Sequence, residues 1–153
     1  MDFRLMAARY RLGALRGEEL PDIAIAMLEN GHDSQPLREL AGLDRPTLRD
    51  ASALFEKVLA AVGQEIPDER GARLLLLERV LGLIITGAID PGEGAYEVWY
   101  SVSELFGEQL DEWMPFVGLA SEYEDYVAGR GEIGRGIVDH AAEALARLRA
   151  AAA

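Results

Sequence analysis

The stretch PDERGARLLLLERVLGLIIT, residues 67–86, decides the fold. Projected onto a helix, it places apolar side chains almost all the way round, from Leu74–Leu77, Val80, Leu81 and Leu83–Ile85. A helix that is apolar on every side has to be covered by other helices. Its apolar part is interrupted by Glu78 and Arg79 and is too short to span a bilayer. The sequence therefore predicts a helical bundle with residues 67–86 at its centre.

Prolines and glycines divide the rest of the chain into further helices. Proline stands just before runs with helical apolar spacing, and glycine stands where such runs stop. No run alternates as a strand would. We expect an all-α fold of about seven or eight helices, at 3–15, 21–30, 35–41, 46–62, 67–86, 91–108, 108–128 and 137–151. Pro115 is expected to kink or restart the seventh helix. A glycine-rich hinge is expected at 129–136.

Composition restricts the class of protein. The 153 residues are most simply one domain, 1–153, and half of them are hydrophobic, which is enough for a core. No cysteine is present, so disulfides and thiolate metal sites are excluded. The N-terminal segment lacks the apolar run of a signal peptide, which predicts a cytoplasmic protein without a membrane span. Fourteen arginines against one lysine, with abundant alanine, predict a bacterial source rich in G and C.

Charge is strongly segregated. Residues 80–129 contain ten carboxylates and no lysine, arginine or histidine, whereas the whole chain has a net charge of −12. Eight of the eleven aromatic residues also lie in this segment. Such a surface repels phosphates and attracts cations or basic proteins, so nucleic acid is not an expected partner.

Helical spacing concentrates the acids of 91–108 on one side. Val98, Val102 and Leu105, with Trp99 and Phe106, face the core, and the glutamates at 93, 97, 104 and 108 lie opposite. Like charges four residues apart disfavour a helix by a few tenths of a kcal/mol per pair. Solvent, a basic partner or the chain's own arginines would have to compensate for this repulsion between the glutamates. The arginines considered for this are Arg4, Arg9, Arg11, Arg16, Arg130 and Arg135.

The function expected on this basis is protein–protein interaction with a basic partner. An immunity or antitoxin-like role, masking a basic toxin, is one concrete form, and a homo-oligomer is left open. The residues predicted to bind the partner are Glu93, Glu97, Tyr100, Glu104, Glu108, Asp111 and Glu112. No pattern indicates a catalytic residue or a cofactor, and an enzyme is the less favoured reading.

The alternative is a metal-binding protein or enzyme that uses His32, Asp33, Asp139 and His140. These are the chain's two histidines with the carboxylate beside each. A metal site needs three or four ligands that converge from fixed elements, and no characteristic ligand spacing is present. The simpler interpretation is a helix end at Gly31 followed by Ser34 as the cap of the next helix.

Two further patterns are weak. Residues 129–134 match G-x-G-x-x-G, but the dinucleotide fingerprint needs a preceding strand, and a helix is expected here. The pair of helices at 21–42 resembles a helix-turn-helix, but its second helix offers one arginine in an acidic chain.

The segment LENGHDSQPLRELAG, residues 28–42, is similar to an L-E-x-G-x-D-S-x-x-L-R-x-L-A-G pattern of bacterial all-helical proteins. The turn GAIDPGEG, residues 87–94, resembles their G-x-I-x-P-x-x-G turn. No activity is known for these proteins, so the resemblance implies a compact bacterial helical fold only.

Overall fold

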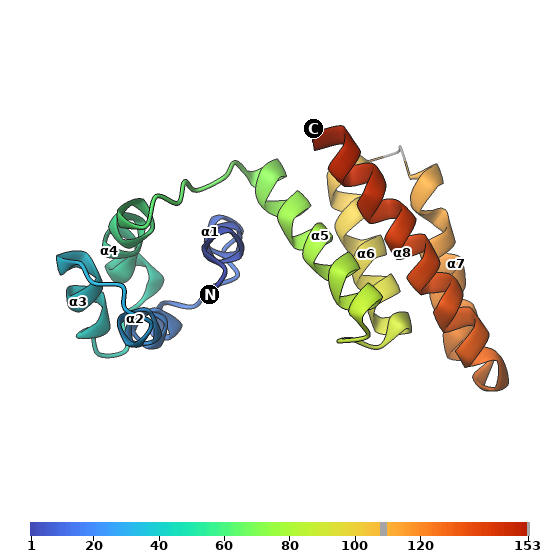
Figure 1. Ribbon diagram of the computed structural model, residues 1–153, viewed down its shortest axis with the longest axis horizontal. Helices are drawn as coiled ribbons and strands as arrows, with labels where there is room; N and C mark the ends of the chain where they lie inside the picture. The colour runs from blue at the N-terminus through green and yellow to red at the C-terminus, as the bar shows by residue number, and fades with distance from the viewer. Residues whose placement is uncertain (108–109, 153) are drawn as a thin grey trace. The chain divides into compact units, whose positions relative to one another are not determined.

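The computed structural model describes residues 1–107 and 110–152, and within them it is all-helical (Figure 1). In this described part of the chain, eight α-helices are joined by loops and three short 3-10 turns, which confirms the predicted class and helix number. The helices are α1 Phe3–Arg11, α2 Leu20–Glu29, α3 Gln35–Ala41, α4 Leu48–Ala61, α5 Glu69–Thr86, α6 Pro91–Phe106, α7 Met114–Asp125 and α8 Arg130–Ala152. In the described part of the chain, no helix combines the length and apolar character needed to cross a bilayer.

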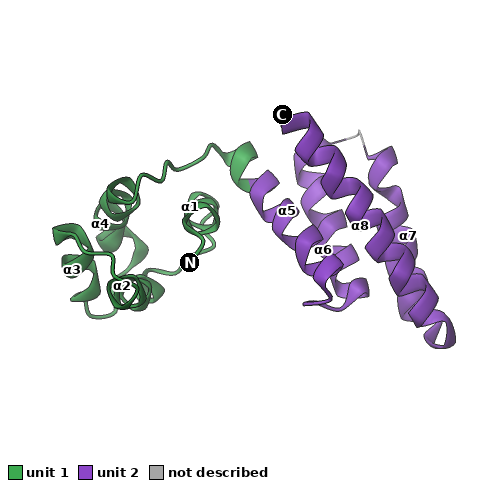
Figure 2. Cartoon of the chain, in the orientation of Figure 1, with its two compact units in different colours: residues 1–72 green, residues 73–153 purple. Residues whose placement is uncertain are grey.

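The chain divides into two compact units, residues 1–72 and 73–153 (Figure 2). Each unit has its own hydrophobic cluster. The sequence predicts one core around residues 67–86. In the structure, α5 contributes Leu77, Leu81 and Ile84 to the cluster of the second unit, whereas the buried residues of the first cluster come from the chain before α5. Helices α1–α4 are amphipathic enough to close a core of their own.

The first unit is built from capped amphipathic helices. Ser34 accepts a hydrogen bond from the backbone N–H of Leu37 and begins α3, as its sequence predicts. Thr47 and Asp50 form a reciprocal capping box at the start of α4. The largest fully buried side chains of this core are Phe55, Leu15, Leu20, Met27, Leu37, Leu40 and Leu59.

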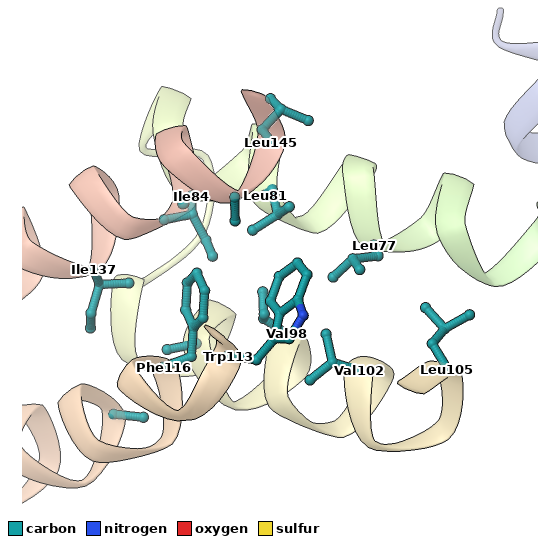
Figure 3. Packing of buried hydrophobic residues seen from close by; sticks show 14 residues of the cluster. Leu77, Leu81, Ile84, Val98, Val102, Leu105, Trp113, Phe116, Ile137 and Leu145 are labelled. Carbon is teal, nitrogen blue, oxygen red and sulfur yellow. The ribbon is translucent and has the colours of Figure 1, made fainter. Parts of the chain in front are cut away.

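The second unit packs α5, α6, α7 and α8 around an aromatic core. Phe116 is buried, and Trp113 stacks on Phe106 with ring centres 5.7 Å apart. Figure 3 shows both Trp113 and Phe116 pointing into the interior between the helices. A Cβ built on Gly94 of α6 would lie 2.5 Å from Cγ1 of Ile84. The absence of a side chain at Gly94 therefore allows α6 to pack closely on α5.

Two expectations concern helix ends. Pro115 is the second residue of α7, so it restarts a helix rather than kinking one; residues 108–109 at the start of the expected 108–128 helix lie outside the described residues. The expected hinge at 129–136 is helical from Arg130 onward, as the first turns of α8. Gly134 is buried against the ring of Tyr123, and this packing outweighs the low helix propensity of glycine.

Candidate functional site

The acidic stripe of α6 is exposed where its helical spacing places it. Glu93, Glu97, Tyr100 and Glu104 are all exposed, and Tyr100 has 72% of its surface accessible. Val98, Val102 and Leu105 on the opposite side are buried. Glu108 lies outside the described residues. The helix therefore separates a buried apolar face from a charged one, as its periodicity requires.

Arginines cover the C-terminal end of this stripe. Nη1 of Arg73, from α5, lies 2.8 Å from Oε2 of Glu104. Further along the chain, Nε of Arg147 on α8 lies 3.6 Å from Oε2 of Glu112, and its guanidinium lies 5.8 Å from the centre of the Trp113 ring. Neither arginine belongs to the six considered from the sequence. We call Glu104 and Glu112, with their arginines, the covered end of the acidic region.

The N-terminal end of the stripe lacks such partners. Glu93 and Glu97 are exposed, and among the described residues neither forms an ion pair. Tyr96, between them, is 42% exposed and donates its hydroxyl hydrogen to Oε2 of Glu124 at 3.1 Å. That hydrogen bond, with some burial and the charges of Glu124 and Asp125, raises the pKa of Tyr96.

We call this region the open acidic face; it consists of Glu93, Tyr96, Glu97 and Tyr100 on α6, with Glu124 and Asp125 at the end of α7. Asp111, which was also predicted to bind a partner, is exposed but precedes Glu112 at the covered end. The structure thus divides the predicted partner-binding residues between two environments.

A hydrogen-bonded cluster fixes α7 against the start of α6. Tyr123 donates to Oδ2 of Asp90 at 2.8 Å, and Asp90 also accepts from the backbone N–H groups of Gly92 and Glu93. Burial disfavours the charge of Asp90, but these hydrogen bonds outweigh it and hold the pKa of the carboxyl below its usual range. The same bond, with burial, raises the pKa of the Tyr123 hydroxyl.

Arg130 stabilises this cluster from the first turn of α8. Its Nε donates to the backbone oxygen of Tyr123 at 2.8 Å and its Nη2 to that of Glu124 at 3.2 Å. Its guanidinium lies 5.4 Å from the centre of the Tyr123 ring. Of the arginines considered from the sequence, Arg130 thus lies near the acidic region, but these two hydrogen bonds go to carbonyl groups rather than to Glu93 or Glu97.

A hollow of about 280 Å³ lies between the start of α6 and the end of α7. The polar side chains among its lining residues are those of Asp90, Glu93, Tyr96, Tyr123, Glu124 and Arg130. Three carboxylates face one guanidinium here, so the hollow carries negative charge next to two aromatic rings. Such an arrangement favours a cationic side chain over an anionic one.

The alternative metal ligands lie in different surroundings. His32 and Asp33 belong to the first unit, and Asp139 and His140 to the second. The described residues contain no group of three or more histidine, aspartate or glutamate side chains placed to hold a metal ion. Asp33 instead pairs with Arg38 at 2.6 Å.

Both histidine rings make aromatic contacts. The ring of His32 meets Phe3 edge to face at 5.1 Å between centres, and that of His140 approaches Phe116 at 6.2 Å. The two histidine rings therefore pack against aromatic side chains of the fold, and Ser34 caps the helix that follows His32 and Asp33.

Tyr96 and Glu124 belong to the acidic segment 80–129 but were not among the residues predicted to bind the partner, and Arg73 and Arg147 were not among the arginines considered. The periodicity of α6 places Tyr96 beside Glu93 and Glu97, so its exposure was accessible from spacing alone. The arginine pairs depend on which helix packs next to which, and single-helix periodicity does not contain that information. Comparisons of the chain with protein-family models, with curated proteins and with solved structures gave no match.

Proposed function

We propose that this protein binds a basic protein partner through its open acidic face. The observation that carries the proposal is the pair Glu93 and Glu97, both exposed and without an ion pair in the described part of the chain. They flank Tyr96 and lie beside Tyr100, the most exposed of the large hydrophobic side chains. Exposed tyrosine next to uncompensated charge is typical of recognition surfaces.

Electrostatic repulsion between Glu93 and Glu97 favours binding of a cationic side chain at the open acidic face. Two glutamates four residues apart repel each other by a few tenths of a kcal/mol, and a lysine or arginine from a partner would remove that repulsion. The net charge of −12 would accelerate the encounter with a basic protein and disfavour nucleic acid. Tyr96 and Tyr100 would add apolar contact area at a small cost in side-chain entropy.

An immunity or antitoxin-like protein is one concrete form of this function. Such a protein masks a basic partner by covering its cationic surface, which needs a stable acidic face rather than a catalytic centre. The rigid attachment of α6 to α7 through Asp90 and Tyr123 supports this form, because a preformed face loses less entropy on binding.

Titration with a short arginine-rich peptide tests the proposal on the full chain. Glu93→Lys with Glu97→Lys should weaken binding by about tenfold or more, since charged contacts are lost and like charges are introduced. The matched control is Glu29→Lys with Glu65→Lys, which makes the same change in net charge at exposed sites of the first unit.

The control variant should retain binding within about threefold, and binding to the unaltered protein should weaken steeply with salt. Equal loss in both variants would show that net charge alone attracts the peptide. Binding that is unaffected by Glu93→Lys with Glu97→Lys would contradict the proposal directly.

A further inference from the structure

A second site lies in the first unit, whereas the acidic region belongs to the second unit. A cavity of about 590 Å³ opens between α1, α4 and the segment that precedes α5. Its size is within the roughly 300–1,000 Å³ of small-molecule sites. The lining consists of Tyr10 and Arg11 from α1, Leu48, Arg49, Ser52 and Glu56 from α4, and Ile66.

One wall of the cavity is fixed by hydrogen bonding. The Tyr10 hydroxyl donates to Oε1 of Glu56 at 2.7 Å, and the Tyr10 ring packs against Phe55 at 5.2 Å between centres. Burial and the Glu56 carboxylate raise the pKa of Tyr10 to about 12, so the hydroxyl stays protonated at neutral pH. Glu56 is the only carboxylate among the lining residues, and it accepts its hydrogen bond from a tyrosine rather than from an arginine.

Two guanidinium groups line the same cavity. Nε of Arg11 donates to the backbone oxygen of Pro67 at 2.7 Å, which orients the group but does not neutralise its charge. Arg49 lies on the same face of α4 as Ser52 and Glu56, at spacings of three and seven residues. Within residues 1–107 and 110–152, neither arginine forms an ion pair.

The cavity thus has more basic than acidic lining residues, although the protein as a whole is acidic. Its charged lining residues are two arginines and one glutamate, and Tyr10 is neutral. Leu48 and Ile66 supply apolar surface beside them. Arginine pairs bind carboxylate and phosphate oxygens with charge-assisted, often bidentate hydrogen bonds. We propose that this cavity binds a small oxyanion with an apolar body, whose charged group lies on Arg11 and Arg49 and whose body lies against Leu48 and Ile66.

Isothermal titration of the full chain with phenyl phosphate and with benzoate tests this site. The two probes share the required chemistry and separate a phosphate ligand from a carboxylate ligand. At least one should bind saturably, and benzyl alcohol, which lacks the charge, should bind at least about tenfold more weakly. Amide NMR shifts on titration should concentrate at Tyr10, Arg11, Arg49 and Ser52.

Arg11→Gln with Arg49→Gln should weaken binding of the preferred anion by about tenfold or more. The matched control is Arg4→Gln with Lys57→Gln, which removes the same charge from exposed positions of the same two helices. That control should bind within about twofold of the unaltered protein. Saturable binding of neither anion, equal loss in both variants, or NMR shifts confined to other residues would overturn the proposal.

Discussion

The two ends of the acidic region differ in how their charge is balanced. At the covered end, Arg73 lies 2.8 Å from Glu104 and Arg147 lies 3.6 Å from Glu112. At the open acidic face, Glu93 and Glu97 have exposed tyrosines beside them, and among the described residues neither forms an ion pair. On α6, Glu104 is thus paired with an arginine of the fold, whereas Glu93 and Glu97 form no ion pair within the described residues. A run of glutamates in the sequence does not distinguish these roles; the neighbouring helices do.

The largest expected effect comes from disturbing the contact that holds α6 in place. Gly94→Ala would bring a Cβ to 2.5 Å from Cγ1 of Ile84, whose side chain is fully buried, so that side chain or one of the helices must shift. We expect a loss of about 1–3 kcal/mol in the free energy of unfolding, measured by urea denaturation.

Gly118→Ala is the matched control for this prediction. Gly118 is an exposed helical glycine of α7, and a Cβ there would meet no atom within 4 Å. Alanine should stabilise the protein by about 0.5–1 kcal/mol because it loses less entropy in a helix. If both substitutions were neutral, the close packing of α6 on α5 would not contribute to stability.

A smaller loss in the free energy of unfolding, about 1 kcal/mol, is expected when the hydrogen bond between Tyr123 and Asp90 is removed. Tyr123→Phe removes the hydrogen bond to Asp90. The pKa of Asp90 is lowered in the folded protein, so its contribution is present above the unfolded pKa of about 3.9 and is lost as pH falls through the folded value.

The difference in stability between Tyr123→Phe and the unaltered protein should accordingly be full at neutral pH and shrink in acid below about pH 4. Urea denaturation at a series of pH values measures it. A difference that stays constant down to strong acid would show that Asp90 is not the partner through which Tyr123 acts.

The smallest effects are expected for the ion pairs of the covered end. In a double-mutant cycle, Arg73→Gln and Glu104→Gln should show a coupling of about 0.3–1 kcal/mol, because both side chains are partly exposed. The longer and more exposed pair of Arg147 and Glu112 should couple by less than about 0.3 kcal/mol. A reversed order would contradict the expectation that the shorter and less exposed pair couples more strongly.

The periodicity of apolar residues was sufficient to predict the helical class and the exposure of the acidic stripe. The spacing of Val98, Val102 and Leu105 against Glu93 and Glu97 corresponds to the buried and exposed faces of α6. The all-α class follows from the same kind of pattern, because proline and glycine positions mark helix ends independently of tertiary packing.

Tertiary contacts account for what the sequence did not predict. Glycines at 131, 134 and 136 favour a loop by local propensity, but the Tyr123 ring packs against Gly134 and the segment is helical. The apolar circumference of α5 indicates burial but does not specify which helices share its core. The partners of Glu104 and Glu112 depend on that packing too, which is why the six arginines considered from the sequence did not include them.

Binding of the arginine-rich peptide to two charge-reversal variants tests the central claim most directly. Glu93→Lys with Glu97→Lys alters the open acidic face, and Glu104→Lys with Glu112→Lys makes the same charge change at the covered end. The first should weaken binding by about tenfold or more and the second by less than about threefold, with both variants confirmed as folded by circular dichroism. Equal losses, or a larger loss at the covered end, would contradict the claim that the open acidic face is the binding surface.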